Sequence, residues 1–193
     1  MNAFSVVIFF AAAAAPEPKA WAPRNARHLS SIYVQRDKLT AADAVAGYNF
    51  GYSVAIDGGT VVVWAPYENS ERGAVYVFRT SDGVQLAKLT AADAAKDDRF
   101  GISVAIDGNT VVVGAYQIGS GGPGSAYVFR TSDGGATYAQ VAKLTASDAA
   151  AGDNFGGSVA ISGDTVAISG GGSVYIFRTT DGGGTWSQVA KLV

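Results

Sequence analysis

An internal repeat of about fifty residues limits the folds open to this chain. The hexapeptide Lys-Leu-Thr-Ala-Ala-Asp stands at 38–43 and 88–93, returns with serine in its fifth place at 143–148, and begins again at 191. Three shorter elements recur in step with it: Phe-Gly from residues 50, 100 and 155, Ser-Val-Ala-Ile from 53, 103 and 158, and Tyr-x-Phe-Arg from 76, 127 and 175. This pattern predicts one supersecondary unit that is copied along the chain and stabilised by its neighbours.

The repeat divides the chain into three whole units and part of another. Residues 31–36 resemble the Tyr-x-Phe-Arg strand and run directly into Lys38-Leu39, so a half unit is expected at 31–40. Whole repeats are then expected at 41–90, 91–145 and 146–193. Residues 16–30 contain Pro, Arg and Ala without periodicity and are interpreted as a linker.

Each unit is expected to form four short strands. In the first repeat these are 53–56, 60–64, 74–79 and 85–89, and Asp57-Gly58 suits a tight hairpin between the first two. Val61, Val62 and Val63 are consecutive rather than alternating with polar residues, which indicates strands buried on both faces of their sheet. The sequence therefore predicts an all-β fold, a partial β-propeller of about three and a half four-stranded antiparallel blades.

A second motif lies between the last two strands of a unit. Residues 179–186 read Thr-Thr-Asp-Gly-Gly-Gly-Thr-Trp, and 131–138 follow the same pattern with tyrosine in the last place. The aspartate can accept backbone N–H bonds, a glycine can supply a left-handed residue, and the aromatic ring can pack on the hairpin. The motif resembles the Asp-box of sialidase-type propellers, and the first repeat keeps only 80–83 of it. The residues expected to be structural are Asp133, Gly135, Asp181, Gly183 and Trp186.

The whole unit resembles the FG-GAP repeat, the blade of integrin α-chain-like propellers, over residues 31–193. Phe50-Gly51 with residues 64–66 approximates the two halves of that repeat, and Phe100-Gly101 with residues 114–116 does so again. The third copy keeps Phe155-Gly156 but has Ser-Gly-Gly at 169–171. The resemblance implies extracellular recognition or cell adhesion through loops on one rim of the propeller.

Calcium binding is not expected, although many FG-GAP blades hold calcium between their first two strands. The corresponding turns are 57–59, 107–109 and 162–164, and each offers at most one carboxylate. Ca²⁺ takes about six to eight oxygen ligands. The nearest acidic cluster comprises Asp97, Asp98, Asp153 and Asn154, which is interpreted as a solvated polar loop. No other metal or cofactor is predicted.

The composition leaves little material for catalysis. The chain has no cysteine and one histidine, His28, which lies outside the repeats, so thiol nucleophiles and most histidine-based triads and metal sites are excluded. Arg79, Arg130 and Arg178 occupy one repeat position, where each is expected to pair with a nearby aspartate or to be solvated. A formal net charge of −2 without a basic block disfavours nucleic acid as a partner.

The copies differ most after their second strand, at 67–72 and at 116–120. A constant scaffold with differing loops favours a recognition surface, so a non-catalytic binding module is the preferred function. The alternatives are a fragment of an Asp-box glycoside hydrolase that lacks its active site, and a purely structural repeat protein. The ligand, protein or glycan, stays open. The candidate binding residues are Tyr67, Glu68, Asn69, Arg72, Tyr116 and Gln117.

Residues 1–15 form an apolar run that is too short for a membrane-spanning helix, which needs about twenty residues. The run suits the apolar region of a signal peptide, which predicts a secreted or cell-surface protein; a mis-predicted start or an extra apolar strand are the alternatives.

Closed propellers have about four to eight blades, so three and a half blades leave open edges and faces. Further repeats in a longer gene product are the favoured explanation. An open arc or strained small ring, and a homodimer that pools two sets of blades, are the others.

Overall fold

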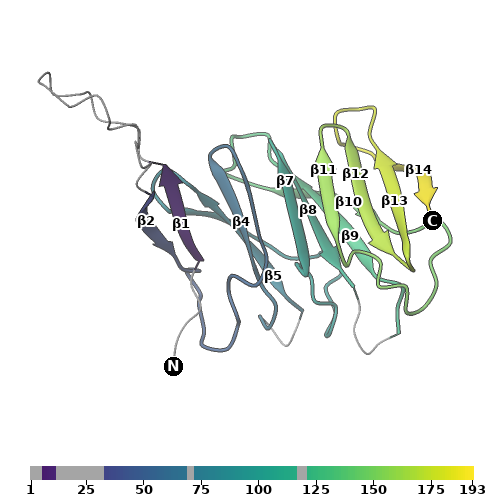
Figure 1. Cartoon of the computed structure of the whole chain (residues 1–193), viewed down its shortest axis with the longest axis horizontal. Coiled ribbons are helices and arrows are strands. Elements are labelled where there is room, and N and C mark those ends of the chain that lie inside the picture. The colour runs from purple at the N-terminus through teal and green to yellow at the C-terminus, as the bar shows by residue number, and fades with distance from the viewer. Residues whose placement is uncertain (1–5, 12–32, 69–71, 117–120) are drawn as a thin grey trace, which may run out of the picture.

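The described chain forms a row of antiparallel sheets and contains no helix (Figure 1). The structure is a computed structural model that describes residues 6–11, 33–68, 72–116 and 121–193, with side chains described from residue 38 onward. Three of its sheets have four strands each, and another pairs two strands near the N-terminus. The all-β, partial-propeller prediction is therefore confirmed.

Each four-stranded sheet is a meander of consecutive strands, and we call these sheets blades 1 to 3. Blade 1 consists of β3 (Val54–Asp57), β4 (Thr60–Ala65), β5 (Ala74–Arg79) and β6 (Gln85–Leu89). Blade 2 consists of β7 (Ser103–Asp107), β8 (Thr110–Ala115), β9 (Ser125–Arg130) and β10 (Ala139–Leu144). Blade 3 consists of β11 (Val159–Ser162), β12 (Thr165–Gly170), β13 (Ser173–Arg178) and β14 (Ser187–Leu192). The first strands are neighbours, because β7 packs against both β3 and β11.

The half blade consists of β1 (Val6–Ala11) and β2 (Tyr33–Leu39). Val7 pairs with Lys38, and a β-bulge follows between Ile8 and Phe9. In blade 1 Tyr76 pairs with Lys88, and a β-bulge follows at the same distance along the strand. This shared register places β2 where a fourth strand lies and β1 where a third strand lies. Residues 33–39 therefore take the place of a fourth strand, in agreement with the alignment of Lys38-Leu39 with Lys88-Leu89, and not that of the Tyr-x-Phe-Arg strand which residues 31–36 resemble.

The apolar run at the N-terminus thus supplies a strand in this structure. Its removal as a signal peptide stays a prediction. The expected linker at 16–30 lies outside the described residues.

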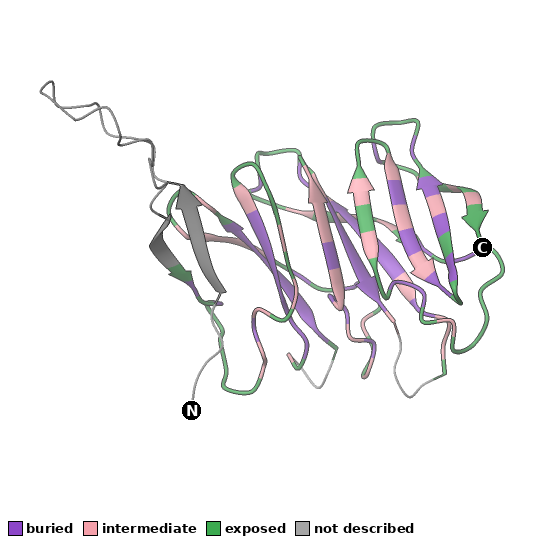
Figure 2. Cartoon of the chain, in the orientation of Figure 1, coloured by how far each residue is buried: buried purple, intermediate pink, exposed green. Residues whose placement is uncertain are grey.

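Each interior blade buries both of its faces, because consecutive valines on a strand point to opposite sides of the sheet. On β4, Val61 and Val63 contact the half blade in a cluster with Phe50, while Val62 and Trp64 pack toward blade 2. A third cluster joins blades 2 and 3 and includes Val112, Val128, Phe155, Ile168, Tyr175 and Phe177. Figure 2 shows buried residues running along β4, β5, β8 and β9. The predicted two-sided burial is confirmed.

Both ends of the row expose apolar side chains. Val54 and Ile56 on β3 are 52% and 55% exposed, because the half blade has no inner strands among the described residues to cover them. At the other end Leu192 is 56% exposed and Val174 is also exposed, whereas the equivalent Val75 of blade 1 is fully buried. Each end therefore presents a face on which another blade could pack.

The hairpins between first and second strands connect successive blades. Asp57 of blade 1 accepts the N–H of Gly108 at 2.7 Å, and Asp107 of blade 2 accepts the N–H of Gly163 at 2.5 Å. We call this contact the hairpin link. It is directional, since each carboxylate binds the blade that follows it, and Ser162 stands where the next such aspartate would be.

The recurring Phe-Gly pair fixes how closely a blade approaches the one before it. Phe155 lies edge-on against Tyr175 in its own blade, with ring centroids 5.4 Å apart. Gly156 has φ 92° and donates its N–H to the carbonyl of Ser169 at 2.9 Å. A Cβ on Gly156 would lie 2.2 Å from the carbonyl oxygen of Ser125 in blade 2. Glycine is therefore required both by the left-handed conformation and by the contact.

We expect Gly156→Ala to lower the free energy of unfolding by about 2–4 kcal/mol, because left-handed strain adds to displacement of the neighbouring backbone. Urea unfolding followed by tryptophan fluorescence measures the loss. Gly59→Ala is the matched control, since its Cβ would meet nothing within 4 Å, and its effect should stay within about 0.5 kcal/mol. Equal losses in the two variants would contradict the close approach of the blades.

Candidate functional site

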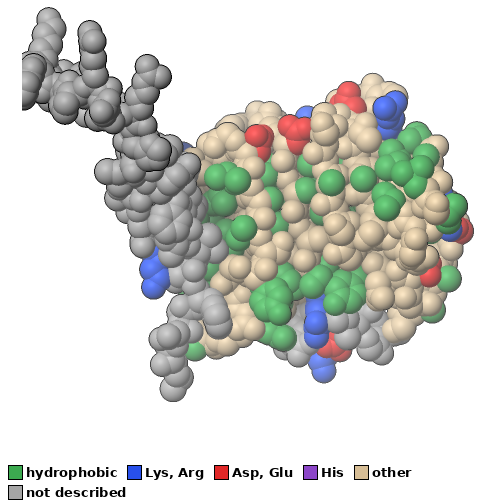
Figure 3. Space-filling model, in the orientation of Figure 1, with side chains coloured by type: hydrophobic (Ala, Val, Ile, Leu, Met, Phe, Trp, Pro, Cys, Tyr) green, Lys and Arg blue, Asp and Glu red, His purple; other side chains and the backbone are tan. Residues whose placement is uncertain are grey.

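The connections between strands lie on two opposite edges of the row (Figure 1). The short hairpins form one edge, the turn rim, with residues 57–60, 80–84, 107–110, 131–138, 162–165 and 179–186. The connections between second and third strands and those between blades form the other edge, the loop rim, with described residues 40–53, 66–68, 72–73, 90–102, 116, 121–124, 145–158 and 171–172. Figure 3 shows the charged side chains of this face gathered mainly toward its margins. On this face, side-chain charge therefore lies toward the margins rather than over the middle of the sheets.

Two of the six predicted binding residues line one groove of the loop rim. Glu68 and Arg72 line a groove of about 240 Å³ together with Thr90 and three alanines, Ala91, Ala92 and Ala94. Tyr67, the neighbour of Glu68 in the chain, is 38% exposed. Tyr116 is half-buried and does not line this groove, and Asn69 and Gln117 lie outside the described residues.

A cluster of lysine, aspartate and tyrosine supports the loop rim in each blade. In blade 1 Lys88 binds Asp43 at 2.5 Å, and the Tyr76 hydroxyl donates to the same carboxylate at 2.9 Å. The lysine also lies 5.5 Å from the centre of the Tyr76 ring. Blades 2 and 3 repeat the cluster with Asp93, Tyr127 and Lys143, and with Asp148, Tyr175 and Lys191. The aspartate of one hexapeptide thus binds the lysine of the next, which explains why both recur.

These clusters keep their charges through the neutral pH range. Burial opposes ionisation of Asp43, but the hydrogen bonds from Lys88 and Tyr76 outweigh it and hold the pKa of Asp43 below its ordinary value. In blade 2, burial together with the bond to Asp93 raises the pKa of Tyr127 to about 12. The shifts move both groups away from neutrality, so the clusters hold loops in place and are poorly suited to proton transfer.

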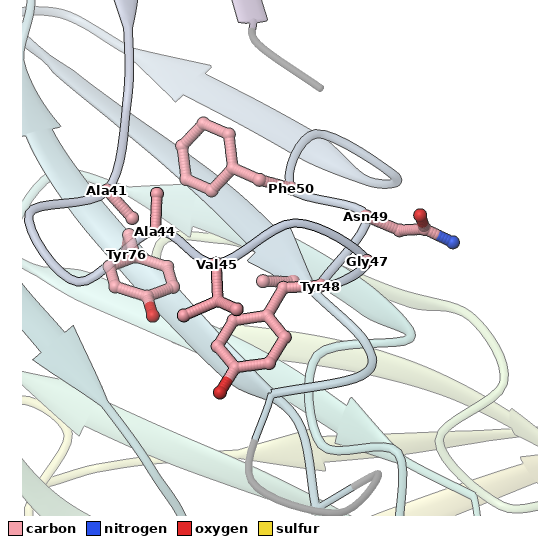
Figure 4. A pocket seen from close by; sticks show the side chains of 9 residues that line it. Ala41, Ala44, Val45, Gly47, Tyr48, Asn49, Phe50 and Tyr76 are labelled. Atoms are coloured by element: carbon pink, nitrogen blue, oxygen red, sulfur yellow. The ribbon is translucent and has the colours of Figure 1, made fainter. Parts of the chain in front are cut away.

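An aromatic pair at the start of blade 1 was not predicted from the sequence. Tyr52 is 69% exposed and lies edge-on to the buried Trp64, with ring centroids 5.5 Å apart, beside a hollow of about 250 Å³ that residues 49–52 line. The hollow next to it, shown in Figure 4, is lined by residues that include Val45 and Tyr48 and has a volume of only about 10 Å³. A signal existed, because Tyr52 and Trp64 are replaced at the equivalent positions of both other copies.

The acidic residues considered for calcium bind backbone groups. Asp98 accepts the N–H of Ala95, and Asp153 accepts the N–H of Ala150, each at 2.7 Å. The hairpin aspartates Asp57 and Asp107 form the hairpin links. In the part of the chain that the structure describes, no group of three or more histidine, cysteine, aspartate or glutamate residues is placed to hold a metal ion. These carboxylates shape loops and joints.

The turns at 131–138 and 179–186 contain the hydrogen bonds that their sequences predict. Asp181 accepts the backbone N–H and the hydroxyl of Thr185 at 2.9 and 2.8 Å, and Asp133 does the same with Thr137 at 2.9 and 2.6 Å. Gly135 and Gly183 have φ of 94° and 100°, and Trp186 packs against the cluster between blades 2 and 3. Bonds from Thr137, together with that from Thr131, lower the pKa of Asp133 to about 2.

The three equivalent arginines have three different partners. Arg79 pairs with Asp82 at 2.7 Å, Arg130 donates to the carbonyl of Gly182, and Arg178 donates to the hydroxyl of Thr165 at 3.2 Å. They lie on successive blades at the ends of third strands, so they do not converge on one point. Of the three arginines, Arg79 forms the predicted pair with a nearby aspartate.

The fold and its repeated joints define a propeller-type repeat module. The FG-GAP repeat matches residues 33–78, 84–129 and 138–177, which together make up more than half of the chain. The chain belongs to the FG-GAP repeat family, whose repeats are typical of adhesion and recognition, usually extracellular or at the cell surface, and typically non-catalytic.

No curated protein sequence matches the chain. Across the described ranges, the structure contains no helix that is long and apolar enough to cross a membrane.

The turn at Asp133 should contribute to acid sensitivity. Its folded pKa of about 2 lies below the unfolded value of about 3.9, so the unfolded state binds more protons between these values. The stabilisation is complete above about pH 4 and is lost as the pH falls toward about 2. Thr137→Val removes one of the bonds to the carboxylate, and we expect it to raise the pKa of Asp133 in an NMR titration. Thr110→Val is the control, and an unchanged titration in Thr137→Val would contradict the assignment.

Proposed function

We propose that the chain is a non-catalytic recognition module, secreted or displayed at the cell surface, that binds its partner through the loop rim. The observation that carries this proposal is the groove lined by Glu68 and Arg72. It is built from a connection that differs between repeats, and a constant stack of blades holds that connection in place. Variable loops on a rigid scaffold are a common way to build a binding surface.

The chemistry of the groove suits the surface of another protein. Lys88 binds Glu68 at 2.8 Å, and the Glu68 side chain is largely covered, so its carboxylate is held in one place before any partner arrives. Arg72 is exposed, and so is the Tyr67 ring. Tyrosine and arginine are enriched among residues that dominate binding energy, and a fixed carboxylate adds orientation.

Two observations favour recognition over catalysis. The arginines that a sialidase-like site would need lie on separate blades with separate partners. The pKa values of Asp43 and Asp93 are lowered and that of Tyr127 is raised, so these groups are shifted away from neutrality, which disfavours general acid or base chemistry.

Binding of the purified chain to an array of extracellular matrix proteins tests the proposal. For the partner found, we expect Tyr67→Ala and Arg72→Ala each to weaken binding at least about tenfold, which is about 1.4 kcal/mol. Arg178→Ala, on the turn rim, is the control and should leave affinity unchanged. Absence of binding, or equal losses in all three variants, would count against the loop rim.

A panel of sialosides and other glycosides tests the hydrolase alternative. We expect no turnover by the purified chain. Turnover that disappears in Arg130→Gln would overturn the non-catalytic assignment.

We also propose that the exposed end faces, with Val54 and Ile56 at one end and Val174 and Leu192 at the other, pack against a further blade. That blade comes from additional repeats or from a second copy of the chain. Light scattering separates the two: a dimer that becomes monomeric in Val174→Asp identifies the second copy. A folded, soluble monomer excludes the homodimer.

A further inference from the structure

A second groove lies on the turn rim, at the joint between blades 2 and 3, and plays no part in the function proposed above. It has a volume of about 220 Å³. The β7–β8 hairpin forms one wall with Asp107 and Asn109, and the β11–β12 hairpin contributes Asp164. Arg130 and Trp186 complete it.

Arg130 is held in this groove differently from its equivalent in blade 1. Arg79 is paired with Asp82 of its own turn, whereas Asp133 bonds with Thr131 and Thr137 inside its turn. Arg130 instead donates to the carbonyl of Gly182 in the next blade. It packs so closely there that a Cβ on Gly183 would lie 2.9 Å from its Cδ. Packing rather than a carboxylate fixes this guanidinium, so its charge acts on the groove.

The corresponding joint between blades 1 and 2 has a leucine side chain beside the turn glycine. Gly135 stands where Gly183 stands in the next blade, and a Cβ there would lie 3.3 Å from the Leu86 side chain. The guanidinium of Arg79 forms a salt bridge with Asp82. The surroundings of Arg130 therefore differ from those of Arg79, although both occupy the same position of the repeat.

The charges in the groove disfavour an anionic ligand. Asp107 and Asp164 supply two carboxylates against the single guanidinium of Arg130. One oxygen of Asp107 accepts the Gly163 N–H, and the other has no bond among the described contacts. Phosphate or a free carboxylate would meet net repulsion here.

The remaining chemistry combines acceptors, donors and one apolar wall. Carboxylate oxygens accept, the guanidinium donates, and the Asn109 amide does both. The indole of Trp186 is half-buried and oriented, because its N–H donates to the Gly183 carbonyl at 3.1 Å. A sugar ring matches this set, since its hydroxyl groups both donate and accept while its C–H face is apolar. We propose that this groove binds one neutral sugar residue of a glycan, with the ring against Trp186 and its hydroxyl groups bonded to Asp164, Asn109 and Arg130.

A glycan array with neutral, sialylated and sulfated members tests the proposal on the full chain. We expect binding to neutral glycans, followed by a change in tryptophan fluorescence when the best neutral glycan is titrated. Asp164→Ala and Arg130→Gln should each weaken that binding at least tenfold. Arg79→Gln is the matched control in blade 1 and should bind as the unmodified chain does.

Three results would overturn the proposal. They are a failure of every neutral glycan to bind, binding confined to sialylated or sulfated members, and unchanged affinity in both groove variants. The thermal midpoint of each variant is measured alongside. Asp164→Asn, which keeps the side-chain shape but removes the charge and replaces one acceptor oxygen with an N–H donor, is tested in place of any variant that unfolds. None of these outcomes affects the loop-rim proposal, whose variants lie on the opposite edge.

Discussion

The packing of one sheet face against the next is the interaction on which the rest of this molecule depends. Val62, Val63 and Val75 are completely buried, and each such side chain contributes about 1.5–3 kcal/mol when it leaves water. A single blade has only four short strands and exposes both faces when alone, so its stability comes from its neighbours. Loops, turns and links can vary between copies only because this packing is constant.

Strand positions could be predicted closely because the repeat gives three readings of each element. The third and fourth strands of blade 1 begin and end where the sequence indicated, and the other two differ by a residue at their ends. The repeat also indicated the place of β2, because Lys38-Leu39 align with Lys88-Leu89 at the end of β6, whereas its pairing with the distant strand β1 could not be predicted from local pattern. The bond from Lys88 to Asp43, between residues 45 positions apart, was hidden for the same reason.

Of the two candidate sites, one could be predicted from the sequence and the other could not. Glu68 and Arg72 could be found because their loop differs from copy to copy, which is visible in sequence. The groove at Arg130 could not be found from the sequence. Arg130 and Arg79 are the same residue type at the same repeat position, and they differ only in the residues that they contact. Identical residue types at equivalent positions thus acquire different roles through their neighbours.

The family repeat and the structural blade are out of phase. Each matched segment starts at or just before a fourth strand and ends in the third strand of the next blade, so one unit of sequence spans a joint. A gene duplication of that unit would copy the junction together with the strands on either side of it. Arrays of this kind can lengthen or shorten by whole units during evolution without having to invent a new contact surface at each step.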